Sequence, residues 1–126
     1  MFNLNSVTKV MTAAGLACLV ADGKLEWTTP IRDILPDFGN SWDPLKPLLT
    51  PLDLLSVRTG RSMLDSMSWQ GNNYVFFKKS ETVDLWNAIP RLTGFRTSFL
   101  YNNWGYAIIG IIVETLSGQK IHDFLR

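Results

Sequence analysis

The chain has 126 residues, a length that suits one domain better than two. Hydrophobic residues make up 46% and charged residues 18%, a globular balance that argues against disorder. The net charge of +1, without a Lys/Arg-rich run, gives no reason to expect nucleic acid as a partner. With one cysteine, Cys18, and one histidine, His122, the chain can form no internal disulfide and no multi-cysteine or multi-histidine metal site.

The first strong pattern predicts a helix over residues 6–22, because apolar residues recur at spacings of three and four. Apolar residues also lie on the other side of this helix. We therefore expect it to be deeply buried, with Cys18 as a small core residue. Asn5 is the expected N-cap and Gly23 the expected stop. The apolar run within it, 10–21, is too short to span a bilayer.

The same run has a second interpretation. Lys9 followed by VMTAAGLACLVA has the positive charge, apolar stretch and small residues of a signal peptide. The charge is single, and a motif beginning at Ser6 accounts for the same residues. We therefore predict neither a signal peptide nor a transmembrane segment in this chain, and the cellular compartment stays open.

Proline and glycine divide the middle of the chain. A short helix is expected after Thr29-Pro30, with Thr29 as N-cap, and it should end at 34–35. The segment 36–49 is rich in proline and predicts a loop. Thr50-Pro51 opens another helix that should end near residue 57.

The second half of the chain is also predicted to be helical. Residues 62–73 are expected to form a loop or short helix, and 80–89 a helix with three apolar residues on one face, Val83, Trp86 and Ile89. A buried helix is predicted over 103–116, ended by Gly118, and a last helix from Gln119. No run of alternating strand residues stands out, so the chain is predicted to be mainly α.

Ser6-Val7-Thr8-Lys9 is an S-x-x-K motif at the start of the first helix. Positions three apart on a helix face the same side, so the Lys9 amine can reach the Ser6 hydroxyl. A serine needs a base beside it to act as a nucleophile. The helix N-terminus and burial both favour a neutral amine, which could take the serine proton. The motif alone is weak, because a helix cap followed by a solvated lysine gives the same pattern.

Tyr101-Asn102-Asn103 is the single Y-x-N triplet of the chain and opens the second apolar helix. A tyrosine there could exchange a proton with Ser6 or with a leaving group. Asn103 could hydrogen-bond Lys9 and a substrate amide. The structural alternative is an N-cap asparagine beside a packed tyrosine.

Two other letter matches are interpreted as coincidences. Ser117-Gly118-Gln119-Lys120 repeats S-x-x-K, but it straddles a predicted helix end with a glycine inside it, so nothing there would hold the lysine still. Arg58-Thr59-Gly60 imitates a K-T-G motif, but it follows a helix and precedes Y-x-N.

The motifs lie in segments that resemble the serine β-lactamase and penicillin-binding-protein superfamily, and most closely its esterase-like, β-lactamase-related branch. Residues 2–38 carry three features in the order typical of that family: S-x-x-K, a D-G-K-L turn at 22–25, and D-x-L-P-x-F at 33–38. Residues 49–60 resemble the next block, and 101–125 the block opened by Y-x-N. Blocks in the right order are more specific than either triplet, and the resemblance is least clear over 61–97.

The resemblance implies one partial domain over residues 1–126. This would be the helical part of an α/β (α+β) β-lactamase/transpeptidase-like fold, lacking most of its antiparallel sheet. It implies that Ser6 is the acylated nucleophile, that Lys9 and Tyr101 supply the general base, and that Asn103 binds substrate. The substrates would be esters, β-lactams or small amides, and neither a metal nor an organic cofactor would be needed.

The chain departs from the family pattern in two ways. Val57 stands where the family usually has histidine and Arg61 where it usually has leucine, positions expected to shape structure more than chemistry. The third family motif, K-T-G or H-x-G on a strand well after Y-x-N, is not in this sequence. That strand would supply the second oxyanion donor. We therefore expect the isolated chain, as a truncated product or fragment, to be nearly inactive and to be unstable or self-associating through uncovered apolar helices.

Two other functions stay open at this point. The chain could be a non-catalytic remnant that keeps the helical scaffold as a binding module. It could also be an unrelated helical interaction domain, in which case Ser6, Lys9, Tyr101 and Asn103 would not converge in space.

Overall fold

The computed structural model describes residues 4–39, 44–65 and 76–126. Its helical elements in chain order are η1 (Asn5–Val7), α1 (Thr8–Ala21), α2 (Ile31–Ile34), η2 (Lys46–Leu48), α3 (Pro51–Leu55), η4 (Lys79–Glu81), α4 (Thr82–Ala88), α5 (Asn103–Ser117) and α6 (Ile121–Phe124). Within the described ranges, strand-like pairing is limited to one isolated antiparallel bridge between Arg61 and Arg91. No helix in those ranges combines the length and apolar character needed to cross a membrane.

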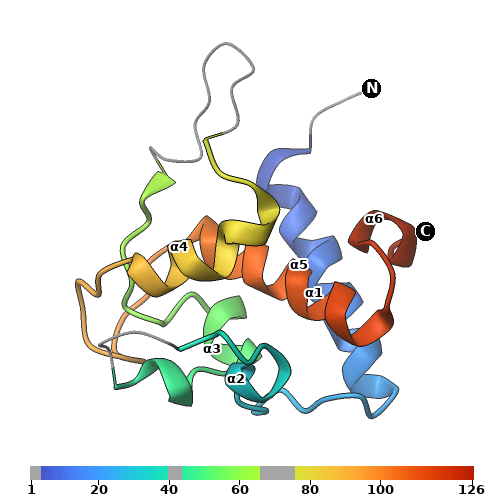
Figure 1. Ribbon diagram of the computed structural model, residues 1–126, viewed down its shortest axis with the longest axis horizontal. Helices are drawn as coiled ribbons and strands as arrows, with labels where there is room; N and C mark the ends of the chain where they lie inside the picture. Colours follow the sequence, from blue (N-terminus) through green and yellow to red (C-terminus); the bar gives the residue numbers. More distant parts are fainter. Residues whose placement is uncertain (1–3, 40–43, 66–75) are drawn as a thin grey trace.

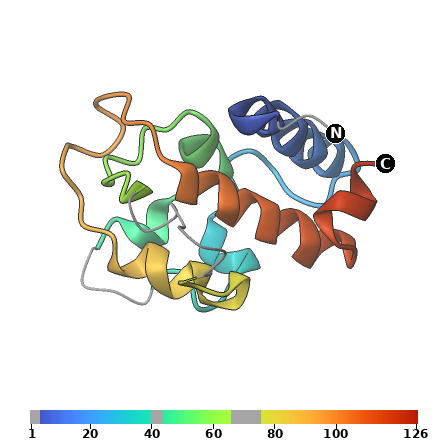
Figure 2. The same cartoon turned by 90° about the horizontal axis from the view of Figure 1, so that it is seen from above.

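Helix α5 forms the centre of the molecule. It runs across the middle of Figure 1, and Figure 2 shows it between α1 on one side and α4 on the other. Asn102 caps its start by accepting a hydrogen bond from the Gly105 N–H at 3.0 Å, and Gly118 ends it with a φ of 71°. The predicted helix over 103–116 is therefore confirmed, and four of its residues are fully buried: Ile108, Ile109, Ile112 and Val113.

Helix α1 is less buried than its composition predicted. It buries three residues, Gly15, Leu16 and Leu19. Val10 is 69% exposed, Met11 is 44% exposed and Cys18 is exposed as well. The expectations of deep burial and of a core cysteine are therefore wrong. A sequence that is apolar all round does not say which side has a neighbour, and in Figure 2 α5 lies along one side of α1.

The two ends of α1 differ in how well they were predicted. Asn5 is not its N-cap: Asn5 has a φ of 46° and begins η1, and the cap position of α1 is Val7 without a side-chain hydrogen bond. The S-x-x-K motif thus begins in a 3₁₀ turn that leads into the helix. At the other end Gly23 has a φ of 69°, which confirms the predicted stop.

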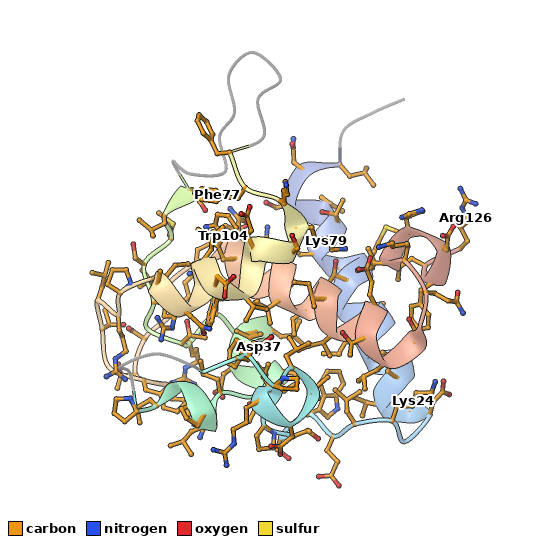
Figure 3. All side chains as sticks on the ribbon, in the orientation of Figure 1. Lys24, Asp37, Phe77, Lys79, Trp104 and Arg126 are labelled. Atoms are coloured by element: carbon orange, nitrogen blue, oxygen red, sulfur yellow. The ribbon has the colours of Figure 1, made fainter. Side chains whose placement is uncertain are left out.

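The C-terminal parts of α1, α5 and α6 pack closely. A Cβ on Gly15 would lie 2.9 Å from the Leu125 Cδ2, so the end of the Leu125 side chain packs directly on the backbone of α1. Figure 3 labels Lys24 just beyond the end of α1; its ammonium donates to the Leu116 carbonyl at 3.4 Å, where the helix dipole favours a cation. The last helix begins at Ile121, slightly later than the expected start at residue 119.

The capping box predicted for α3 is present. The Thr50 hydroxyl accepts from the Asp53 N–H, the Asp53 carboxylate accepts from the Thr50 N–H at 3.0 Å, and Pro51 occupies the first turn. The helix ends at Leu55, close to the expected end near residue 57.

The start of α2 differs from its prediction. Its N-cap is Pro30 and its first residue is Ile31, so the expectation of Thr29 as N-cap is wrong. The Thr29 hydroxyl instead accepts from the Glu26 N–H at 2.8 Å, which closes the turn before the helix. The predicted end is confirmed, because α2 stops at Ile34.

Helix α4 confirms the helical pattern predicted over 80–89. Trp86 and Ile89 are buried and Val83 packs partly buried against the same core. Phe38 stacks on Trp86 with ring centroids 6.0 Å apart, which joins the segment after α2 to α4.

A turn after α3 pairs with the segment that leads into α5. The Leu100 N–H donates to the Val57 carbonyl at 2.9 Å, and the Leu92 N–H donates to the Gly60 carbonyl at 2.8 Å. Val57 has a φ of 50°, a conformation that is costly for a β-branched residue and easier for histidine. Valine in place of the family's usual histidine therefore affects the backbone conformation of this turn.

The segment 62–73 is predicted to form a loop or short helix. Its residues 66–73 lie outside the described residues.

Arg61, which stands where the family usually has leucine, is 2% exposed. Its guanidinium donates to the Ile89 carbonyl and lies 5.4 Å from the centroid of the Trp86 ring. A hydrogen bond and an aromatic face thus compensate for the burial of this side chain.

Candidate active site

Ser6 and Lys9 meet at the start of α1. The Lys9 Nζ donates to the Ser6 Oγ at 3.2 Å, as their spacing predicted. Ser6 is exposed and Lys9 is partly buried, so the nucleophile candidate stands at an open helix start and not on a buried one. An open start leaves the hydroxyl within reach of a substrate.

Tyr101 joins this pair from 95 residues further along the chain. Its hydroxyl lies 2.8 Å from the Ser6 Oγ. Lys9 and then Ser6 lower the pKa of Tyr101 below its ordinary value of 10.0, because both favour the phenolate. Ser6, Lys9 and Tyr101 therefore form one connected cluster, in which a proton can pass between the three polar groups.

Lys9 lies between two aromatic rings. Its Nζ is 4.8 Å from the Tyr101 ring centroid and 5.5 Å from that of Tyr106. The Tyr106 hydroxyl donates to the Leu55 carbonyl at 3.0 Å, which fixes its ring against the end of α3, and burial raises the pKa of Tyr106. Ring faces attract an ammonium group and so help to hold Lys9 beside Ser6.

Asn103 has a different partner from the one expected. Its Nδ2 donates to the Asp65 Oδ1 at 3.0 Å, and the structure gives no hydrogen bond between Asn103 and Lys9. Asn102 provides the helix cap, so the capping interpretation of the triplet holds for Asn102 and not for Asn103. Asn103 is the first residue of α5 and faces the segment that contains Asp65.

Sequence reasoning missed two residues of this site. Tyr106 follows Asn103 by three positions on α5, and that spacing alone indicates that the two side chains share one helix face. Asp65 carried no such signal, because it is a single carboxylate in an irregular polar segment.

The two coincidental motifs do not form sites. The Ser117 hydroxyl accepts from the Gln119 N–H at 3.2 Å, across the turn at Gly118. In the second motif, the Thr59 hydroxyl accepts from the Arg61 N–H at 3.3 Å and the Arg58 guanidinium donates to a carbonyl. The Ser117 and Thr59 hydroxyls are thus bonded to nearby backbone N–H groups, and the Arg58 guanidinium to the Arg96 carbonyl.

An ion pair anchors the segment that delivers Tyr101. Arg96 donates to both Asp53 carboxylate oxygens, at 2.7 and 2.8 Å, and its own N–H donates to the Arg58 carbonyl at 2.8 Å. Asp53 is 4% exposed and belongs to the capping box of α3. Helix α3 and the chain before Tyr101 are thereby joined by charge-assisted bonds.

Comparison with known proteins agrees with this arrangement. A D-stereospecific amidohydrolase from Streptomyces superposes with a TM-score of 0.81 at 20% identity, over 98% of this chain and 39% of that one. The D-amino acid amidase from Ochrobactrum anthropi, solved with D-phenylalanine, gives a TM-score of 0.79 at 27% identity, over 99% of this chain and 40% of that one. The first likeness is one of fold alone.

Sequence relatives lead to the same class. Penicillin-binding protein 4 of Amycolatopsis lactamdurans is 33% identical over 99% of this chain, and the unguisins hydrolase of Aspergillus campestris is 31% identical over 100% of this chain. This chain spans 32% and 24% of those two proteins. The β-lactamase family model matches residues 1–126, and the chain therefore belongs to the β-lactamase family.

Replacing Tyr101 with phenylalanine is expected to slow labelling of Ser6 by about a hundredfold, because it removes the hydroxyl that lies 2.8 Å from the Ser6 Oγ, within reach of the serine proton, and keeps the ring beside Lys9. The rate of labelling by a serine-directed reagent measures this. Ser98→Ala is the matched control: it removes a hydroxyl from the segment before Tyr101 whose partner is the Thr93 hydroxyl, at 3.0 Å, so it should label nearly as fast as the unaltered chain. Equal rates for Tyr101→Phe and the unaltered chain would exclude a proton-transfer role.

Proposed function

We propose that this chain carries the acylation site of a β-lactamase-related serine hydrolase or acyltransferase. The Ser6 Oγ attacks the carbonyl carbon of an ester, β-lactam or small amide and forms an acyl-enzyme. The serine proton passes to the Lys9–Tyr101 pair and then to the leaving group as the carbonyl–leaving-group bond breaks. Water or another acceptor then takes the acyl group. The Ser6 N–H, at an open helix start, is a donor for the developing oxyanion.

One observation carries this proposal. The Ser6 Oγ has the Tyr101 hydroxyl at 2.8 Å and the Lys9 Nζ at 3.2 Å, and the tyrosine comes from a distant part of the chain. A helix cap with a solvated lysine requires no such third partner. The relatives support the class of reaction, because their names include hydrolases and an amidase.

The acylating chemistry is tested by mapping a covalent label. A fluorophosphonate reagent forms an Oγ–P bond and releases fluoride, with the serine proton passing to the neighbouring base. We expect the label on the peptide that contains Ser6. Labelling is expected to be slow, because the strand with the second oxyanion donor is not in this sequence. A label confined to other residues of a chain that circular dichroism shows to be helical would contradict the proposed function.

We also propose that these helices are the helical part of the family's α+β fold and that its antiparallel sheet covers the outer face of α1. Val7, Val10 and Met11 on that face are 62%, 69% and 44% exposed. Apolar side chains gathered along one helix face favour burial against another element, or against a second copy of the chain. This exposure supports the expectation of self-association.

A further inference from the structure

Tyr106 is fixed in its place beside Lys9 by a neighbouring helix. Its hydroxyl donates to the carbonyl of Leu55, the last residue of α3, at 3.0 Å, and its side chain is half-buried. Burial raises the pKa of this hydroxyl, so it stays protonated and remains a donor. Helix α3 packs closely on α5 at this point, since a Cβ on Gly105 would lie 3.5 Å from Leu54. The place of the Tyr106 ring is therefore set by α3 and not by Lys9.

Lys9 has a long side chain that needs restraint to act on Ser6. Its Nζ donates to the Ser6 Oγ at 3.2 Å, and the centroids of the Tyr101 and Tyr106 rings lie 4.8 and 5.5 Å from it. A lysine carries its charge on a flexible four-carbon stem, which one hydrogen bond restrains only in part. The face of an aromatic ring attracts an ammonium group within about 6 Å. Because the Tyr106 hydroxyl is bonded to Leu55, what this residue contributes to Ser6 passes through Lys9.

We propose that Tyr106 is a positioning residue for acylation: the charge distribution of its ring face holds the Lys9 amine beside Ser6, and the Leu55 carbonyl holds the ring. This proposal rests on the proposed function, because a displaced amine slows the proton transfer that accompanies attack by Ser6. An attraction of the size typical of a partly desolvated cation and ring corresponds to about a fivefold change in rate.

The decisive variants change the charge of the ring face and keep its shape. Tyr106→Phe retains the ring and should keep most of the labelling rate. Fluorine atoms withdraw electrons from the ring face, so monofluoro-, difluoro- and trifluorophenylalanine at position 106 should label Ser6 progressively more slowly. The trifluoro variant should be about fivefold slower than Tyr106→Phe, and Tyr106→Leu, which has no ring, should be slowed at least as much.

Intact-mass measurement with a fluorophosphonate gives these rates. The reaction joins the Ser6 Oγ to phosphorus and releases fluoride, and the serine proton passes to the Lys9–Tyr101 pair. The maximal rate should fall, whereas the reagent concentration that gives half of it should not change, because Tyr106 acts on Lys9. The matched control is trifluorophenylalanine in place of Phe124, whose ring packs on α1 near Gly15; it should leave the rate unchanged.

A spectroscopic measurement detects the contact without any labelling. Protons above the face of an aromatic ring resonate upfield of their usual position in an NMR spectrum. The ε-methylene signal of Lys9, identified by its loss in Lys9→Arg, should therefore move downfield in Tyr106→Leu and remain upfield in Tyr106→Phe. The signal of Lys24, whose ammonium donates to the Leu116 carbonyl, should not move in either variant.

Two results would overturn this proposal. Equal labelling rates across the fluorinated series would show that the ring only fills space. A Lys9 signal that stays in place in Tyr106→Leu would show that the ring does not face the amine, even where labelling is too slow to compare. If Tyr106→Leu does not fold, the fluorinated series decides, because it keeps the shape of the ring. A label confined to residues other than Ser6 would instead contradict the proposed function, so the two failures are told apart.

Discussion

Replacing Ser6 with alanine is expected to abolish covalent labelling of the site; removal of the nucleophile from a serine protease lowers kcat by about 10⁶-fold. The variant removes the oxygen that would form the acyl bond and leaves Lys9 and Tyr101 in place. Because the Ser6 side chain is exposed, its removal leaves no cavity, and the helical circular dichroism spectrum should not change. Intact-mass measurement after incubation with a fluorophosphonate checks the loss.

The second S-x-x-K copy supplies the matched control. Ser117 has a lysine at the same spacing, but its hydroxyl is bonded to the backbone of Gln119. Ser117→Ala should therefore label as fully as the unaltered chain. Labelling of Ser6→Ala at the full rate, or loss of labelling in Ser117→Ala, would remove Ser6 from the mechanism.

Replacing Asp53 with alanine is expected to have the largest effect on stability, a loss of roughly 2–4 kcal/mol in the free energy of unfolding. The change removes the capping box of α3 and both hydrogen bonds from Arg96. Arg96 is half exposed and can be hydrated after the change, so the loss should stay below that for a fully buried pair. Urea denaturation followed by circular dichroism measures it.

A surface carboxylate provides the comparison. Asp33 pairs with Arg32 at 3.7 Å, and both side chains are more than half exposed. Asp33→Ala should change the free energy of unfolding by only about 0.5 kcal/mol. A similar loss in both variants would show that the Asp53–Arg96 pair contributes no more than a surface pair.

The same carboxylate makes stability depend on pH. Burial raises the pKa of Asp53, but hydrogen bonds from Arg96 and Thr50 outweigh burial and hold it below 3.8, its ordinary value. Asp53 is therefore ionised more readily in the folded chain, so its contribution is complete above about pH 3.8 and is lost as pH falls through the folded pKa.

Unfolding curves across this acid range should show a smaller loss of stability in Asp53→Asn than in the unaltered chain. Burial raises the pKa of Glu114, but hydrogen bonds from Lys79 and the Ile121 N–H outweigh burial and lower this pKa below its ordinary value. Glu114 therefore also loses its contribution to stability in acid, and it does so equally in both proteins. The difference between the two curves then isolates Asp53. Parallel curves would show that Asp53 keeps an unperturbed pKa.

The sequence by itself determined the local structure at helix ends, where particular residue types bond to the backbone or allow it a positive φ. Thr50-Pro51 and Asp53 specify a capping box, and Gly23 and Gly118 specify helix ends, because these residues satisfy or release the backbone locally. The same holds for Ser6 and Lys9, since one helical turn separates them whatever the rest of the chain does. Motif order likewise indicated the β-lactamase family, to which the chain belongs.

Only the tertiary structure decided which face of α1 is covered and that the Tyr101 hydroxyl lies beside Ser6. It also decided that the Tyr106 ring packs against Lys9 and that Asn103 donates to Asp65. Each depends on the pairing of the turn after α3 with the segment before α5, and on the Asp53–Arg96 ion pair that holds this segment. Spacing along a helix fixes direction over a few residues. It carries no information on contacts between residues nearly a hundred positions apart, because those depend on how separate elements pack.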